Sequence, residues 1–146
     1  MASTVAEYKK DIAAAYDVYM AELKQAGANW ETKPAHGEGE EAWSARQVGE
    51  HVAGAATFFG GGLAQYLGLQ GPERAQPSFA TAAEAATGMA AAFGKFVAVV
   101  DQIKDDKLSL EFDVPRLGKQ TVAGILGIQS YHLNDHAGQL KKLRGG

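Results

Sequence analysis

The sequence predicts an all-α fold: a four-helix bundle with long crossover connections and a short extended segment between the third and fourth helices. Four stretches carry apolar residues at the three- and four-residue steps of a helix that faces a core. Stretches rich in glycine and proline separate them, and there is no internal repeat and no low-complexity tail. With 146 residues the chain is long enough to bury one core, so we expect a single domain over residues 1–146.

The first predicted helix covers about residues 4–25, with Ser3 or Thr4 available as its N-cap. Its apolar positions follow the helical period: Val5, Tyr8, Ile12, Ala15, Tyr16, Tyr19, Met20 and Leu23. Residues 26–43 break this pattern with three glycines and a proline, and they are predicted to form a long loop. In this loop we expect His36 to be solvated, together with the acidic residues Glu38, Glu40 and Glu41.

The second helix has a well-marked start. Ser44 is placed as its N-cap, and Gln47 is the matching capping-box residue. Trp43 and Val48 occupy the hydrophobic-staple positions. The helix is predicted to run to about Leu67, with an inward stripe of Val48, Val52, Ala55, Phe59, Leu63 and Tyr66.

The middle of the chain holds a glycine run, a connection and the third helix. Glycines at 60–62 cost about 1 kcal/mol each relative to alanine in a helix interior, so they indicate a kink, an end or close packing of a neighbouring backbone. Residues 68–78 contain two prolines and are predicted to be a connection. Thr81 and Glu84 form a second capping box, which opens a helix that continues to about Ile103.

The last part of the chain combines a strand pattern with a helix pattern. Residues 107–114 alternate apolar and polar side chains, which predicts a short extended segment or hairpin that turns at 115–118. Thr121 then caps the fourth helix. His132 and His136 fall on or beside its apolar stripe of Val122, Ile125, Leu126, Leu133, Leu140 and Leu143.

Three histidines are predicted to face the interior from two helices. His132 and His136 are four residues apart and therefore point the same way, and His51 lies on the stripe of the second helix. Three imidazoles are the ligand number of an open metal site. If the two helices run antiparallel, all three rings lie at nearly one height, and residues 68–80, which reach about 40 Å when extended, must cross the length of the bundle. The alternative is that the histidines are packed at a half-buried face.

Two segments carry a resemblance to a known family. Trp-Ser-Ala-Arg-Gln-Val-Gly-Glu-His at 43–51 and His-Leu-Asn-Asp-His-Ala-Gly-Gln-Leu at 132–140 resemble the signature segments of the DinB-like (DinB/YfiT) metal-binding four-helix bundles. The resemblance implies one divalent metal ion bound by His51, His132 and His136.

Imidazole-only ligation suits zinc or nickel and, less selectively, iron or manganese. A ligating histidine normally donates its other ring N–H to a polar partner, for which the nearest candidates are Glu50, Asp135 and Gln139. We expect Glu50 and Asp135 to face solvent instead. Tyr19, Tyr16 or Gln139 is a candidate for orienting a substrate.

Two functions are compatible with these observations. The resemblance implies a metal-dependent enzyme that activates a low-molecular-weight thiol or water, either a thiol S-transferase or a hydrolase acting on a small-molecule substrate. The alternative is a stress-associated or interaction module with a structural or regulatory metal, forming a homodimer through an alanine-rich helix face. A third possibility is a four-helix bundle that binds no metal ion.

Composition and charge limit the classes of partner that we expect for this chain. The formal net charge is −3, and the only basic cluster is Lys141, Lys142 and Arg144, so we expect no nucleic-acid partner. The chain has no cysteine, so any thiol chemistry needs a borrowed thiol. We find neither a signal peptide nor an apolar run of membrane-spanning length, and we therefore expect a cytoplasmic protein with no membrane partner.

Overall fold

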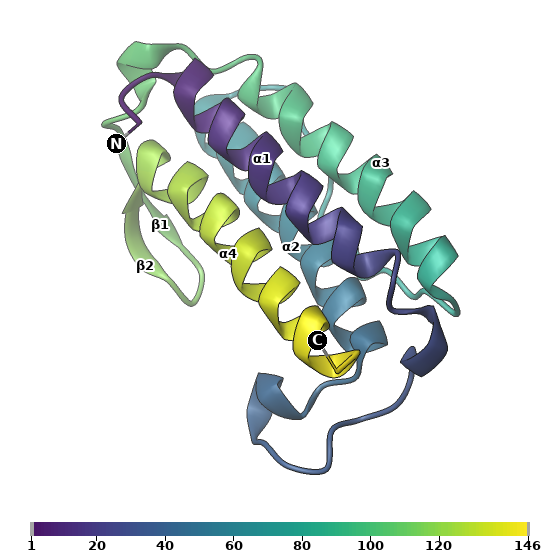
Figure 1. Cartoon of the computed structure of the whole chain (residues 1–146). Helices are drawn as coiled ribbons and strands as arrows, with labels where there is room; N and C mark the ends of the chain where they lie inside the picture. The colour runs from purple at the N-terminus through teal and green to yellow at the C-terminus, as the bar shows by residue number, and fades with distance from the viewer. Residues whose placement is uncertain (1, 146) are drawn as a thin grey trace.

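Four long helices and one small hairpin make up the computed structural model, which describes residues 2–145 (Figure 1). The helices are α1 (Val5–Leu23), α2 (Ala45–Leu67), α3 (Ala82–Val100) and α4 (Val122–Leu143). Strands β1 (Glu111–Val114) and β2 (Gly118–Thr121) form an antiparallel hairpin before α4, in which Phe112 faces Gln120. Single 3-10 turns lie at Gly27–Asn29, Gly39–Ala42 and Asp105–Lys107. The predicted four-helix bundle with an extended segment between its last two helices is confirmed.

The helices are arranged so that α2 runs antiparallel to α4 and parallel to α3 (Figure 1). Helix α1 packs on α4 and α3, and α2 packs on the same two helices from the other side. Two contacts fix the ends: Arg144 binds Glu22 at one end of the bundle, and the backbone N–H of Val5 donates to Asp105 at the other. After α2 the chain runs back along the bundle to reach the start of α3, as the sequence predicts.

Side-chain caps set the helix starts. Ser44 and Gln47 form the predicted capping box at α2, in which each side chain accepts a hydrogen bond from the other residue's backbone N–H. Thr4, Thr81 and Thr121 cap the other three helices. The second predicted capping box is only half formed, because the hydroxyl of Thr81, not its backbone N–H, donates to the Glu84 carboxylate. These caps explain why helix starts can be located from sequence.

Close packing accounts for two of the three consecutive glycines at 60–62 of α2. The helix continues through them without interruption. A Cβ on Gly60 would lie 3.4 Å from the Cα of Phe96, and one on Gly61 would lie 2.7 Å from the carbonyl oxygen of Pro72. Gly62 faces open space. The segment between α2 and α3, residues 68–81, is called the crossing segment below. It can lie against α2 because Gly60 and Gly61 lack side chains.

Two aromatic residues depart from the predicted core. Tyr66 was expected to face inward, but 44% of it is exposed, because the end of α2 borders the hairpin and not the bundle interior. Its ring stacks on Phe112, and its hydroxyl donates to the carbonyl oxygen of Glu111. Trp30, in the predicted loop, is buried and donates from Nε1 to the carbonyl oxygen of Phe79 at 2.9 Å.

One helix in residues 2–145, α3, is long and apolar enough by length and composition to cross a membrane. The expectation that no run reaches that length is therefore wrong by this measure, because alanines count as apolar around the whole helix. A single such helix is weak evidence of a span, since the core helix of a soluble bundle passes the same test. Here α3 packs against α2 and α1. A cytoplasmic location stays a prediction.

Candidate metal site

The three predicted histidines meet between α2 and α4. The Nε2 atom of His132 lies 2.9 Å from Nε2 of His51 and 3.1 Å from Nε2 of His136. One ring nitrogen from each residue lies within 4.8 Å of the other two. His51 comes from the second turn of α2, and the pair comes from successive turns of α4, which runs the opposite way. The antiparallel arrangement places all three rings at one level of the bundle.

The three rings are suited to hold a metal ion. Burial, and then the neighbouring His136 and His51, lower the pKa of His132 to about 3. Burial and His136 also lower the pKa of His51, with a smaller opposing effect from Glu40. These two imidazoles are therefore neutral at neutral pH and keep a lone pair for a ligand bond. Two imidazole nitrogens on one tetrahedral zinc ion lie about 3.4 Å apart, so the observed spacings need only small ring movements.

Aromatic side chains surround the histidines. The Trp43 ring lies 4.9 Å from the His51 ring, edge to face, and 6.4 Å from the nearly parallel His136 ring. Phe59 stands perpendicular to His132 at 6.3 Å. Trp43 was predicted as a staple residue at the start of α2 and as part of the signature segment 43–51. In the structure, that position also places its ring against two histidines. The aromatic groups restrict the orientations open to the imidazoles.

Gln139 orients His136, the most buried of the three histidines. His136 is only 1% exposed, and its Nδ1 lies 2.7 Å from Oε1 of Gln139. The Gln139 Nε2 donates to the carbonyl oxygen of Glu40 at 2.6 Å, which leaves Oε1 as the acceptor facing the ring. His136 therefore donates from Nδ1, and the lone pair of its neutral form lies on Nε2, inside the triad.

Glu40 is a site residue that the sequence pattern did not reveal. Its side chain is 57% exposed, yet its Oε1 lies 3.7 Å from Nε2 of His136. The 3-10 turn Gly39–Ala42 brings it there. The only signal in the sequence is its position four residues before the N-cap Ser44, inside an acidic run that was expected to be solvated. Glu40 is the carboxylate closest to the triad among the contacts of the described residues.

A pocket of about 570 Å³ opens onto the triad. His51 and His132 line it, whereas His136 does not. Its other walls come from α2, from the crossing segment and from the hairpin turn, and they include Phe58, Phe59, Arg74, Pro77, Pro115 and Arg116. A molecule in this pocket reaches two of the three histidines.

Comparison with known proteins identifies the family. The model of the DinB superfamily matches residues 11–140 of the chain. The chain belongs to the DinB superfamily. No curated protein matches it.

Solved structures show the same fold as this DinB-superfamily chain. A DinB-like protein from Bacillus cereus ATCC 10987 is 20% identical, with a TM-score of 0.75 over 99% of this chain and 93% of the other. The four-helix bundle protein TT2238 is 24% identical, with a TM-score of 0.67 over 98% and 100%. The colibactin self-resistance protein ClbS, in complex with a double-stranded DNA, is 12% identical, with a TM-score of 0.72 over 100% and 98%.

The ClbS complex corrects one prediction. Nucleic acid was excluded as a partner because the net charge is negative and only one basic cluster is present in the sequence. That exclusion is wrong for this fold, because a bundle of the same architecture is in complex with DNA. Net charge sums the whole chain and does not report how charges are distributed over a surface. The likeness does not test the predicted homodimer or small-molecule substrate.

Within the described chain, the remaining predicted site residues of this DinB-superfamily protein form no hydrogen bond with the triad, although Glu50 lines the triad pocket. The Glu50 carboxylate is neither beside the histidines nor free in solvent: it accepts from Nε of Arg46 at 3.0 Å and from the backbone N–H of Phe79 at 2.7 Å. Glu50 has these partners because the crossing segment passes over it, and the sequence does not specify the path of that segment. Asp135 is exposed and lines a different pocket, together with His36. Tyr19 is fully buried, and its hydroxyl has no partner among the described residues.

Proposed function

We propose that this DinB-superfamily protein is a metal-dependent enzyme that activates a small thiol or water at a divalent ion held by His51, His132 and His136. The observation that carries the proposal is the convergence of three ring nitrogens beside a pocket that reaches two of them. A divalent ion at such a site lowers the pKa of a bound thiol or water and supplies a nucleophile near neutral pH. Zinc and nickel suit the all-imidazole ligand set best.

Residues of the chain support this chemistry around the triad. Gln139 holds His136 in the ring orientation that directs Nε2 inward. Glu40 brings a carboxylate to 3.7 Å from that Nε2, where Oε1 can accept the proton that a thiol or water loses. The aromatic rings of Trp43 and Phe59 pack against His51 and His132.

The alternative is a structural or regulatory metal in a non-catalytic module. A structural site is closed by a fourth protein ligand, whereas a catalytic site keeps a position open. Within residues 2–145, the group of ligands that converges consists of the three histidines. The Glu40 carboxylate, 3.7 Å from Nε2 of His136, lies beside this group on a side chain that is 57% exposed. His36, the remaining histidine, is exposed in the loop and lines another pocket. These observations favour the open, catalytic arrangement.

Metal content is the first test. We expect about one metal ion per chain in protein purified without a histidine tag. The His132→Ala/His136→Ala variant should lose it, whereas the His36→Ala control should keep it. Thiol consumption with an electrophilic acceptor is then measured for all three proteins. Metal-free protein whose melting temperature does not change with added zinc or nickel would refute the proposal and leave a bundle with three interior histidines.

Double-stranded DNA is a second candidate ligand, and the ClbS complex is the observation that favours it. The densest cations are at the end of α4, where Lys141 and Lys142 are exposed. Fluorescence anisotropy of a labelled duplex tests this candidate. Salt-sensitive binding that weakens in Lys141→Gln/Lys142→Gln supports it, and unchanged anisotropy at low salt removes it.

A further inference from the structure

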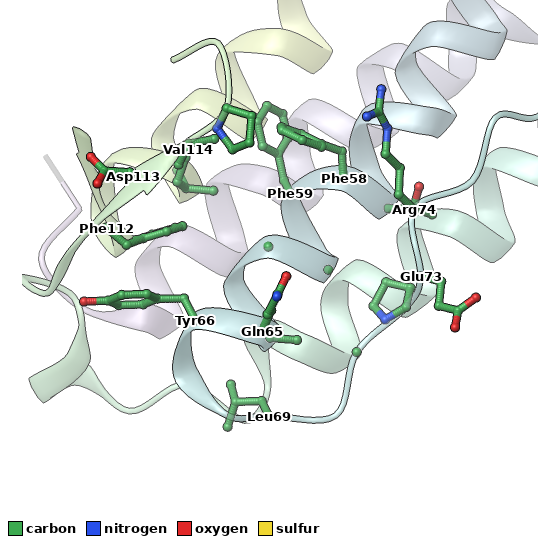
Figure 2. Close-up of a pocket in the computed structure, with 18 residues that line it drawn as sticks. Phe58, Phe59, Gln65, Tyr66, Leu69, Glu73, Arg74, Phe112, Asp113 and Val114 are labelled. Carbon is green, nitrogen blue, oxygen red and sulfur yellow. The ribbon is translucent and has the colours of Figure 1, made fainter. Parts of the chain in front are cut away.

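A second pocket, of about 800 Å³, lies between the C-terminal half of α2, the crossing segment and the hairpin (Figure 2). Its lining is mostly apolar and aromatic: Phe58, Phe59, Tyr66, Leu69, Phe112 and Val114. The rings of Tyr66 and Phe112 stack with centroids 4.4 Å apart, and those of Phe58 and Phe59 meet edge to face at 5.5 Å. Flat aromatic walls of this kind favour an apolar ring as the occupant.

This apolar pocket meets the triad pocket. Phe58, Phe59, Arg74 and Pro115 line both. Along α2, the seven or eight residues from His51 to the two phenylalanines correspond to roughly 10–12 Å, and the whole distance to Tyr66 corresponds to about 22 Å. An elongated small molecule can therefore extend from the apolar pocket to the histidines along one face of α2.

The charge at the junction is positive. The Arg74 guanidinium lies 5.3 Å from the centroid of the Phe58 ring, and within residues 2–145 it forms no ion pair. The carboxylates of Glu73 and Asp113 also border the apolar pocket, but Figure 2 shows them pointing away from its centre.

The charged residues around the triad pocket also leave cations available to a ligand. Its Glu50 is ion-paired with Arg46, which also pairs with Glu31. Its Glu40 lies beside His136, and Arg116 adds a second cation from the hairpin turn. An anionic group on a ligand thus has Arg74 as its partner at the point where the two pockets meet.

We infer that the substrate is a small amphipathic anion: an apolar, preferably aromatic, ring in the pocket between Tyr66 and Phe59, one carboxylate paired with Arg74, and a reacting group that extends toward His51 and His132. This inference rests on the proposed function for the reacting end. The ring and the carboxylate are assigned by the two pockets and by Arg74 alone.

Calorimetric titration of the full-length protein with 4-phenylbutyrate and with its neutral analogue 4-phenylbutan-1-ol tests the assignment. We expect the carboxylate to bind about 5- to 10-fold more tightly than the alcohol, and Arg74→Gln to abolish that difference. Gly62→Leu should weaken both ligands at least about tenfold, because a Cβ at Gly62 meets open space inside the pocket and a larger side chain fills it without a clash.

Matched controls are Lys95→Gln, which likewise removes a cation, and Gly94→Leu, which adds the same side chain; both lie on the exposed part of α3, away from both pockets. Both should bind like the unaltered protein. The inference is overturned by absence of saturable binding at millimolar ligand, by equal affinity for acid and alcohol, or by full binding in Gly62→Leu.

The same titration on His132→Ala/His136→Ala separates the two proposals. Loss of metal with retained phenylbutyrate binding shows that the pocket acts independently of the histidines. Retained metal in the unaltered protein with no phenylbutyrate binding refutes the substrate class and leaves the metal proposal standing.

Discussion

Nδ1 of His136 and Oε1 of Gln139 lie 2.7 Å apart, and the Gln139 amide is itself fixed by the carbonyl oxygen of Glu40. The contact joins residues one turn apart on α4, and the Glu40 carbonyl ties it to the loop before α2. A single amide thus determines both the proton position on one histidine and the placement of the loop that carries the nearest carboxylate.

Replacing Gln139 by leucine should lower metal affinity by roughly 10- to 100-fold, because His136 loses the partner that fixes its ring and its tautomer. Competition with a chromophoric chelator measures this affinity. Asn134→Ala, at an exposed position of the same helix, is the control and should bind metal normally. Unchanged affinity in Gln139→Leu would show that helix packing alone orients the ring.

Glu40→Gln should leave metal content unchanged and reduce the rate of the thiol or hydrolytic reaction by roughly 100-fold, because the side chain loses its capacity to accept a proton. Elemental analysis and initial rates on the same preparation give the two readouts. Glu41→Gln, in the same turn but without a contact to the histidines among the described residues, should keep its rate. If Glu40→Gln instead loses metal, the carboxylate acts as a ligand.

Acidification should destabilise the metal-free protein. The pKa of His132 is about 3 in the folded chain against an ordinary value of 6.5, and that of His51 is shifted the same way. Below about pH 6.5 the unfolded chain therefore binds protons that the folded chain does not, and the free energy of unfolding falls by up to about 1.4 kcal/mol per pH unit for each fully shifted histidine. The effect is absent above that range.

Urea unfolding between about pH 7 and pH 5 measures this loss. The slope against pH should be smaller in His132→Gln, which cannot titrate at that position. An equal slope in the variant would assign the acid sensitivity to other groups.

Two adjacent glycines of α2 should respond to alanine with opposite signs. Gly61→Ala places a methyl group 2.7 Å from the carbonyl oxygen of Pro72, which must move, so we expect a loss of about 1–3 kcal/mol. Gly62→Ala meets nothing within 4 Å and should gain up to about 1 kcal/mol of helix stability. Thermal and urea unfolding of the two variants measure these changes in the free energy of unfolding. If both changes had the same sign, the packing described above would be wrong.

The fold was predictable because its signals are local. Ser44, Thr81 and Thr121 mark helix starts through hydrogen bonds within one turn, and the spacing of apolar residues shows which side of each helix is buried. The relation between His51 and the pair on α4 also follows from counting residues along two antiparallel helices. In contrast, Trp30 and Phe79 lie in connections, where burial depends on segments distant in sequence.

The surroundings of the site were less predictable for the same reason. From the sequence of α2 alone, Glu50 is predicted to be a surface residue. In the structure, the crossing segment covers it, and the backbone N–H of Phe79 donates to its carboxylate. Glu40 sits in an acidic run, and only a 3-10 turn brings it to His136. The apolar pocket combines α2, the crossing segment and the hairpin, so no single stretch of sequence encodes it.

The separation of the ligands along the chain also affects when the site can form. His51 and His132 are 81 residues apart, and two of the three imidazoles belong to the last helix. A chain still emerging from the ribosome without α4 offers a metal ion one histidine of the triad. Capture of the proposed ion would therefore follow docking of α4, and the bound ion would cross-link α2 to α4 and report that the bundle has closed.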